Sequence, residues 1–343
     1  MKSIHDVLTL ARQRRAADVH LIAGAPVLFR IERELVPVTK EKLSRDICRE
    51  LAYSLLSAEQ ITQFEADLDY DFMFADKERN RHRVNICYND GAVGAVIRLL
   101  PSEPIPLDVL QLPPIVAQLT LARKGLILLT GSTSQGKTTT MSAMIDSINV
   151  NARKHIVTIE DPIEYVHTNK NSIVRQREVG KDTSGFSRGL RAALRQDPDV
   201  ISVGEMRDYD TIKTALTAAE TGVLVMSTLH IISIDKIIER LLSYAPDGSD
   251  GHIRTLLAES LLGVIHQELL PTTSGGKRIA TEILIVNDAV RNVMRKRDTF
   301  HLRNSITTGQ RWGMRSMKTS LDQMKDEGVI SETVYQQVVE NYR

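Results

Sequence analysis

The segment Gly131–Thr138 reads GSTSQGKT and fits the pattern G-x-x-x-x-G-K-[ST]. Its glycines let the backbone curl so that amide groups point at phosphate oxygens, and the start of a following helix adds its dipole to the same anion. A lysine at the position of Lys137 reaches the β- and γ-phosphates, and the Thr138 hydroxyl is expected to bind Mg²⁺.

The flanking segments supply the context that this motif needs. The apolar run KGLILLT precedes it and the helical stretch TTMSAMIDSIN follows it, so that a strand leads into the loop and a helix leaves it. A chance match on a turn rich in glycine and serine does not account for both flanks. The sequence therefore predicts a nucleoside triphosphate site. The expected binding residues are Gly131, Ser132, Thr133, Ser134, Gln135, Gly136, Lys137, Thr138 and Thr139.

Carboxylates follow the next apolar run. Enzymes with this kind of loop need acidic groups at neighbouring strand ends, which hold the metal and orient the attacking water. Glu160, Asp161 and Glu164 come directly after HIVTI, and such crowded carboxylates repel one another unless a cation or a catalytic role uses them. A solvated loop with incidental acids is the alternative.

A second acidic position is Glu205, which ends the apolar run VISVGE where a Walker B strand conventionally ends in Asp. At a strand tip, Glu205 is expected to hold Mg²⁺ through water. Arg207 and Asp208 follow, and a structural ion pair between these two is the alternative to a functional role for Arg207.

His230 ends another apolar run, GVLVMSTLH. It is either a packed, hydrogen-bonded residue or a sensor of the γ-phosphate, because its strand ends at the same sheet edge as the other candidate residues. The remaining histidines lack the spacing of metal ligands on one helix, and two cysteines, Cys48 and Cys87, cannot form a four-cysteine zinc site. No zinc is expected.

These residues need a sheet to position them. Apolar runs at 125–130, 155–159, 200–203, 222–228 and 279–286 alternate with helical segments, which indicates a buried, largely parallel sheet. Helical patterns then cover 289–297, 301–308, 316–325 and 332–339.

The first hundred residues have a different pattern. Helical spacing at 4–15 and 43–56 is mixed with short strand-like pieces at 19–22, 27–33, 71–74, 83–88 and 92–99, which favours a small α+β domain. Five of the eleven prolines lie in 101–114, where they exclude regular structure. We expect domains at 1–100 and 115–343 with 101–114 as linker, the alternative being a long loop within one domain.

Composition excludes several classes of protein. The chain has 44 Lys+Arg against 43 Asp+Glu and only 4% aromatic residues, which disfavours coating of nucleic acid or stacking on its bases. The N-terminus does not resemble a signal peptide, and no apolar run approaches the ~20 residues that span a bilayer. We expect a cytoplasmic protein.

Together these segments resemble one family. The sequence is similar to the secretion ATPases of type IV pili and type II secretion, and among these to the pilus-retraction (twitching-motility) ATPases of the PilT type. The resemblance covers essentially the whole chain. The segments that carry it include AADVHLIAGAPVLFRIE, RHRVN, AVIRLLP, TIEDPIEYVH, QREVGKDTSGFSRGLRAALRQDPDVISVGEMRD, TALTAAETG, STLH and AVRNVMRKRD.

The resemblance implies a PAS-like α+β N-terminal domain and a RecA-like P-loop NTPase domain with a helical C-terminal end, assembled as a homohexamer. It implies Mg²⁺-dependent ATP hydrolysis that powers type IV pilus retraction through pilin disassembly. The implied partners are an inner-membrane platform protein and a second pilus ATPase, with no nucleic acid. The platform would hold the motor at the inner face of the inner membrane.

The resemblance also implies residue roles. Glu164 matches the general base of the family's Asp box, Glu205 the atypical Walker B position that supports Mg²⁺, and His230 the His box. Arg83 and Arg98 match arginines that the N-terminal domain swings onto the nucleotide phosphates. An arginine brought in by domain closure stabilises transition-state charge and couples hydrolysis to movement. Ion pairing on the strand surface is the alternative for both arginines.

Three departures from the family pattern stand out. Ser132, Ser134 and Gln135 replace the usual Pro, Gly and Ser of the phosphate loop, and loss of the interior glycine is expected to restrict the loop and slow turnover. Ile231 and Ile232 replace two threonines after His230. Lys296 replaces the Glu that ends a segment linked to retraction, here 289–295.

Two other functions remain open at this stage. Assembly or secretion motors usually carry an extra N-terminal domain and a four-cysteine zinc module, whereas no cysteine follows Cys87 here. A non-hydrolysing nucleotide-binding subunit that regulates a partner motor is suggested by the altered loop. The chain retains the residues expected to hydrolyse ATP, which argues against it: Lys137, Thr138, Glu164, Glu205, Arg83 and Arg98. The direction of the motor, its pilus system and the firing order of ring sites are not determined by the sequence.

Overall fold

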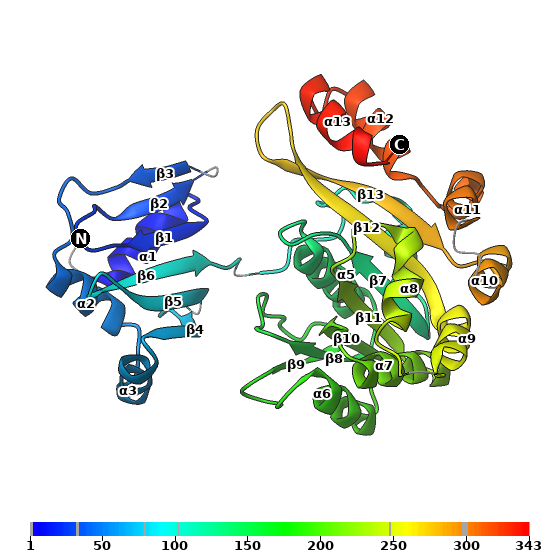
Figure 1. Cartoon of the computed structure of the whole chain (residues 1–343), viewed down its shortest axis with the longest axis horizontal. Helices are drawn as coiled ribbons and strands as arrows, with labels where there is room; N and C mark the ends of the chain where they lie inside the picture. Colours follow the sequence, from blue (N-terminus) through cyan, green and yellow to red (C-terminus); the bar gives the residue numbers. More distant parts are fainter. Residues whose placement is uncertain are drawn as a thin grey trace. The chain divides into compact units, whose positions relative to one another are not determined.

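The computed structural model describes residues 3–31, 34–78, 80–101, 103–246, 248–296 and 301–342. The chain divides into two compact units, Met1–Glu103 and Pro104–Arg343 (Figure 1). The division falls within the proline-rich stretch, where chain segments lack the donors for regular pairing.

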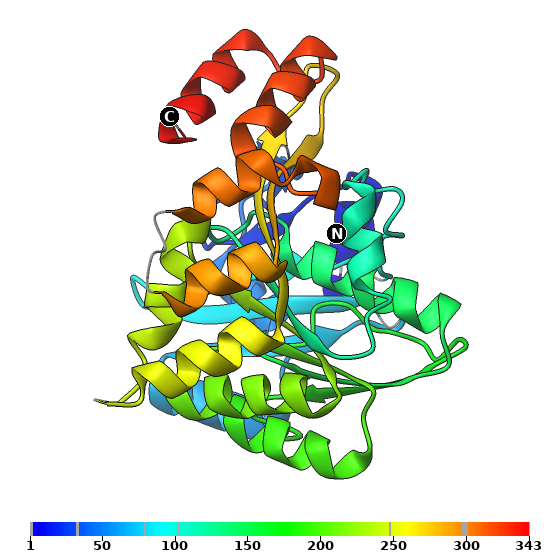
Figure 2. The ribbon, with the colours of Figure 1, turned by 90° about the vertical axis from the view of Figure 1, so that its right-hand side faces the viewer.

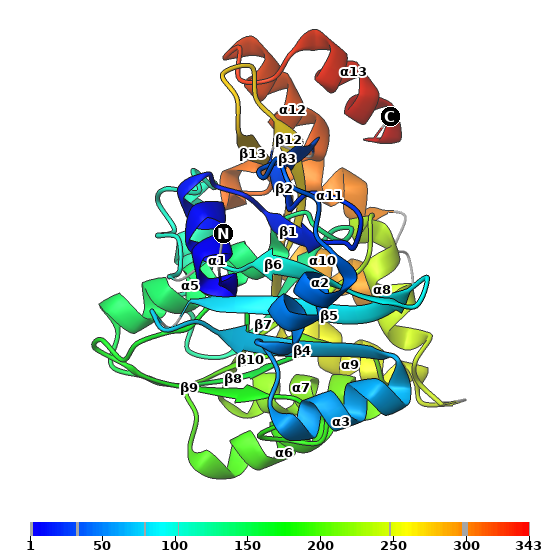
Figure 3. The same cartoon turned by 90° about the vertical axis from the view of Figure 1, so that its left-hand side faces the viewer.

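The first unit contains an antiparallel sheet of six strands in the order β3-β2-β1-β6-β5-β4. Helices α1 and α2 share one apolar core with this sheet (Figure 3). Helix α1 begins where Ser3 and Asp6 form a capping box, which satisfies backbone donors at the helix start. The elements are α1 (Ile4–Gln13), β1 (Asp18–Leu21), β2 (Leu28–Ile31), β3 (Glu34–Pro37), α2 (Arg45–Tyr53), α3 (Ala58–Asp67), β4 (Asp69–Ala75), β5 (Arg81–Asn89) and β6 (Ala92–Leu99).

Two elements of this unit were not predicted, α3 and β3. In α3 only Phe64 is buried, so the helix has almost no apolar face that a sequence pattern could reveal. Strand β3 has four largely exposed residues at the sheet edge, and its pairing with β2 is a tertiary feature.

The second unit contains a sheet of seven strands in the order β13-β12-β7-β11-β10-β8-β9. Its strands are parallel except β13, as the apolar runs predicted. All six residues of β7 are buried, because helices cover both faces (Figure 2). The strands are β7 (Gly125–Thr130), β8 (His155–Glu160), β9 (Ile173–Glu178), β10 (Val200–Glu205), β11 (Leu224–Leu229), β12 (Leu261–Pro271) and β13 (Lys277–Ile285).

Two apolar clusters lie on the two faces of this sheet. One contains Leu126 and Leu128 with residues of α6 to α11, and the other contains Ile127 and Leu129 with residues of α4 and α5. The helices are α4 (Pro114–Leu119), α5 (Lys137–Asn151), α6 (Phe186–Ala193), α7 (Tyr209–Thr221), α8 (Ile237–Leu242), α9 (Asp250–Ser260), α10 (Asp288–Arg295), α11 (Leu302–Thr308), α12 (Met317–Asp326) and α13 (Glu332–Val339).

Strands β9 and β12 were missed. Strand β9 is the sheet edge and reads IVRQRE, so its charged residues hide the strand pattern. Strand β12 carries His266, Gln267 and Glu268 in the middle of apolar residues, and these polar residues break the run. The hairpin of β12 and β13 extends to α12 and α13, which pack on it around a separate apolar cluster (Figure 1).

Two other sequence expectations concern the helix at 289–297 and membrane-spanning segments. The segment 289–295 lies in α10, with Val290 and Met294 buried; position 297, the expected end of this helix, lies outside the described residues. Within the described part of the chain, no helix is long and apolar enough to cross a bilayer.

Replacement of Leu128 by Ala should lower the free energy of unfolding by about 3 kcal/mol, because it leaves a cavity in the fully buried centre of the sheet. Leu121→Ala is the matched control, since its side chain is 76% exposed. Urea unfolding of both variants tests this, and equal destabilisation would contradict the burial of β7.

Candidate active site

The phosphate loop joins β7 to α5. Ser132, Thr133 and Ser134 form its exposed crest, and Thr138 and Thr139 lie in the first turn of α5. Gly136 is the N-cap of this helix, with φ of 80°. The helix start therefore directs its free amide groups toward the loop, the arrangement that binds phosphate.

Gly131 is the most constrained residue of the loop. Its φ is 141°, and a Cβ built there would meet the carbonyl oxygen of Gln267 in β12 at 2.6 Å. No side chain fits against a backbone oxygen at that distance. Gly131 is thus required by the close approach of β12 as well as by its own backbone angles.

Ser134 and Gln135 show how the altered loop is held. Ser134 has φ of 64°, in the left-handed region that favours glycine, which costs about 1 kcal/mol for another residue. The Gln135 side chain accepts a hydrogen bond from the Leu269 amide at 2.5 Å, and Gln267 donates to the Gln135 carbonyl at 2.7 Å. Strand β12 therefore fixes the strained part of the loop.

The Lys137 side chain lies inside the loop. It is 7% exposed, and its Nζ donates to the carbonyls of Gly131 and Ser132, each at 2.7 Å. His230 Nδ1 lies 3.5 Å from Nζ. Burial lowers the pKa of Lys137 to about 8, and the charge of Glu205 opposes part of this shift. The ammonium group is thus charged at neutral pH and placed among the loop's backbone groups.

Glu205 lies at the end of β10 between two basic side chains. Arg207 contacts Glu205 Oε1 at 2.6 Å, and His230 Nε2 lies 3.6 Å from Oε2. Arg207 pairs with Glu205 and not with Asp208, the partner considered as an alternative, because Asp208 caps α7 and accepts hydrogen bonds from Thr211. Burial, then the charge of Lys137, lowers the pKa of His230.

Glu164 sits in a loop that is anchored on both sides. The Ile163 amide donates to Glu178 at 3.3 Å, and the Tyr165 hydroxyl bonds Thr139 of α5 at 2.8 Å. Glu160 instead accepts from Thr158 at 2.5 Å and Gln176 at 3.0 Å. The structure thus separates a structural carboxylate, Glu160, from the half-buried Glu164 on a loop tied to the nucleotide-binding helix.

Arg83 and Arg98 lie in the first unit, directly opposite each other on β5 and β6. Both are exposed, whereas their strand neighbours Val84 and Ile97 are buried. Arg98 donates to Asp18 at 2.9 Å. The two arginines form one basic patch, partly neutralised by Asp18.

Sequence reasoning missed the residues that support the loop from behind. His266 and Gln267 of β12 contact Thr130 and Gln135, and Tyr165 holds Thr139. The sequence feature that could have revealed His266 and Gln267 is the polar triplet HQE inside the apolar segment LLGVIHQELL. Buried polar groups need partners, and here the partners belong to the phosphate loop.

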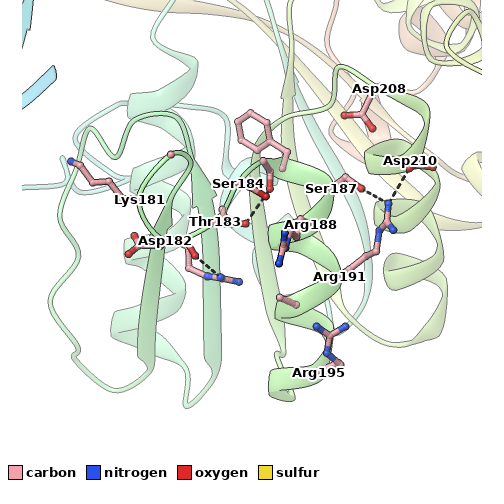
Figure 4. Close-up of a pocket in the computed structure, with 15 residues that line it drawn as sticks. Lys181, Asp182, Thr183, Ser184, Ser187, Arg188, Arg191, Arg195, Asp208 and Asp210 are labelled. Carbon is pink, nitrogen blue, oxygen red and sulfur yellow. Dashed lines mark hydrogen bonds and ion pairs between the residues drawn. The ribbon is translucent and has the colours of Figure 1, made fainter. Parts of the chain in front are cut away.

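A separate hollow of about 1400 Å³ lies beside α6 (Figure 4). Arg188, Arg191 and Arg195 line it, and Arg191 bonds Asp210 at 2.9 Å and Ser187 at 2.7 Å. Its lining residues fall between 177 and 210, outside the phosphate loop. This hollow is therefore distinct from the nucleotide site.

Gly131→Ala should weaken nucleotide binding by about tenfold or more, because the added methyl group forces the loop away from β12. Gly275→Ala is the control, since Gly275 also has a positive φ but open space around it. Titration with a fluorescent ADP analogue measures both affinities. Unchanged affinity in Gly131→Ala would show that the β12 contact does not constrain the loop.

Nucleotide affinity should depend on pH through Lys137. Above a pKa of about 8 the free protein loses the ammonium charge, so affinity should fall by about tenfold per pH unit from there upward. In Lys137→Arg the cation stays charged, and its affinity should be flat over the same range. Titrations from pH 7 to 9.5 test this, and parallel profiles for the two proteins would refute it.

Comparison with known proteins places this chain in a family. The family described as Type II/IV secretion system protein matches residues 1–340. The Type IV pilus retractation ATPase PilT of Pseudomonas aeruginosa is 40% identical over 96% of this chain and 95% of its own. A twitching motility protein of Neisseria gonorrhoeae is 40% identical over 90% of this chain and 83% of its own.

Structural similarity agrees with sequence similarity. A crystal structure of the pilus retraction motor PilT with bound ADP superimposes with a TM-score of 0.90 and 40% identity, covering 98% of this chain and 96% of the other. At 98% coverage, the superposition includes residues of both units. The chain belongs to the type II/IV secretion system protein family and is an ATPase that resembles the PilT pilus-retraction motors.

Proposed function

We propose that the protein is a Mg²⁺-dependent motor that powers type IV pilus retraction by pilin disassembly, as a homohexameric ring. The observation that supports this most is the likeness to PilT over both units, at 40% identity and a TM-score of 0.90. A motor needs the unit that moves as well as the unit that hydrolyses ATP, and this likeness extends to both.

The site suits Mg²⁺. The Oε2 atom of Glu205 is buried and lacks a hydrogen-bond partner within the described residues, and Thr138 supplies a hydroxyl on the first turn of α5. Mg²⁺ takes oxygen ligands and keeps several waters and phosphate oxygens, so few protein ligands suffice. When bound, the ion would neutralise charge on the phosphates. Thr138 would ligate it directly and Glu205 through water.

The remaining residues divide the catalytic work. Lys137 would hold the β- and γ-phosphates, and Glu164 would accept the proton of the attacking water. His230, which lies between Lys137 and Glu205, would sense the γ-phosphate. The patch of Arg83 and Arg98 would supply positive charge to the transition state when the units close. Such closure would couple hydrolysis to movement.

The proposed partners follow from the motor role. An inner-membrane platform protein would hold the ring at the cytoplasmic face, and a second pilus ATPase would assist it. Light scattering of the purified chain with nucleotide tests the hexamer.

Hydrolysis assays test the assigned roles. Purified wild type should hydrolyse ATP with Mg²⁺, and Lys137→Ala should lose both binding and turnover. Glu164→Gln should keep nucleotide affinity and lose about 100-fold or more in kcat, as for removal of a general base. Glu220→Gln, an exposed site in α7, is the matched control. Binding without turnover in the wild-type ring would favour a regulatory subunit.

The direction of the motor is tested in cells. Deletion of the gene from its own host should leave pili on the surface and abolish their retraction, and the Glu164→Gln gene should fail to restore it. Loss of surface pili after deletion would instead identify an assembly motor.

A further inference from the structure

A chain of hydrogen bonds joins the phosphate loop to the C-terminal helices. Thr130, the last residue of β7, precedes Gly131 and contacts His266 Nδ1 through its hydroxyl at 3.1 Å. His266 Nε2 lies 2.9 Å from the Tyr342 hydroxyl, and that hydroxyl donates to Glu268 at 2.5 Å. Thr130 is 0% and His266 1% exposed, so water does not compete for the bond between them, whereas the two bonds of Tyr342 are partly buried.

Each hydrogen bond in this series is donated in the direction from Thr130 toward Glu268. The carboxylate of Glu268 only accepts, so the Tyr342 hydroxyl donates to it and its oxygen accepts from His266 Nε2. Burial, and then the charge of Lys137, lowers the pKa of His266 to about 4, which leaves the ring neutral with Nδ1 as acceptor. Thr130 donates to that nitrogen. Every member is satisfied only when all four residues are in place.

Strand β12 contacts both the phosphate loop and Tyr342 of the C-terminal segment. His266 is paired in register with Thr130, and Gln267 and Leu269 bond Gln135 of the loop. A Cβ on Gly131 would meet the Gln267 carbonyl oxygen at 2.6 Å, so strand and loop lie close together there. On the other side, Tyr342 bonds two alternate residues of the same strand, His266 and Glu268. A displacement of the C-terminal helices that moves Tyr342 is therefore expected to move the segment of β12 that contacts the phosphate loop.

We infer that His266 is a positioning residue that couples nucleotide binding to the C-terminal helical unit, defined as α12, α13 and the 3-10 turn Glu340–Tyr342. His266 contacts Thr130 at the entrance of the loop, and we expect it to act through that residue. Coupling of this kind is reciprocal: nucleotide binding stabilises the arrangement of the helical unit, and a partner that moves the unit changes nucleotide affinity. The inference rests on nucleotide binding by the chain and not on pilus retraction.

The structure supplies a matched pair of tyrosines for the test. Tyr342 and Tyr335 both lie in the C-terminal helical unit and both donate to a carboxylate, Tyr335 to Asp322 at 2.6 Å. Only Tyr342 also contacts His266. Tyr342→Phe should weaken binding of a fluorescent ADP analogue about fivefold, and Tyr335→Phe should leave it unchanged. Equal effects, or none in Tyr342→Phe, would overturn the inference.

A double-mutant cycle separates coupling from general destabilisation. Thr130→Val and Tyr342→Phe each remove one hydroxyl group. In this series of hydrogen bonds, Thr130 and Tyr342 are connected only through His266. Each single variant should weaken ADP binding about fivefold, and the double variant by about the same factor, because one broken link already disconnects the chain. Losses that multiply to about 25-fold would show independent effects and refute coupling.

Hydrogen exchange tests the reverse direction. Added ADP should slow amide exchange in residues 317–342 of the wild type and of Tyr335→Phe. It should leave exchange there unchanged in Thr130→Val, an isosteric variant that is expected to fold. Protection by ADP in Thr130→Val equal to that in wild type would refute the inference. If the protein binds ADP with this coupling but does not retract pili, only the proposed function fails.

Discussion

The parallel register of the buried strands determines where the candidate residues of the second unit lie. Strands β8, β10, β11 and β12 run in the same direction as β7 or are linked to it through parallel neighbours, so their carboxyl ends meet at one edge of the sheet. Each end contributes one group: Glu205 from β10, His230 from β11 and the Glu164 loop from β8. These acidic and imidazole side chains therefore lie at the same edge of the sheet as the phosphate loop.

The predictable part of the site is local in sequence. The loop 131–138, Glu205 and His230 each end an apolar run, and a run followed by a polar residue is visible without knowledge of the fold. The unpredicted part depends on strand order. Nothing in the sequence shows that β12 lies beside β7, so the contacts of His266 and Gln267 with the loop could not be foreseen. In the same way the capping role of Asp208 could not be foreseen, because it depends on where α7 begins.

Charge around the loop is arranged for an anion. Burial lowers the pKa values of His230 and His266, so the histidines stay neutral and the positive charge resides on Lys137 and Arg207. Arg207 is already paired with Glu205. Lys137 has only backbone carbonyls as close partners in the loop, and a carbonyl is a weaker partner than a phosphate for an ammonium group. The buried Lys137 ammonium group therefore favours binding phosphate oxygens over these carbonyls when a nucleotide enters the loop.

The departures in the loop change how its shape is maintained. An interior glycine adopts a left-handed conformation without strain, whereas Ser134 adopts it at a cost. The bonds of Gln135 to Leu269 and Gln267 supply the opposing stabilisation. The loop of this protein is consequently held by a neighbouring strand more than by its own backbone. Because that strand is also bonded to Tyr342, the bonds of Gln135 connect the loop's geometry to the C-terminal helices.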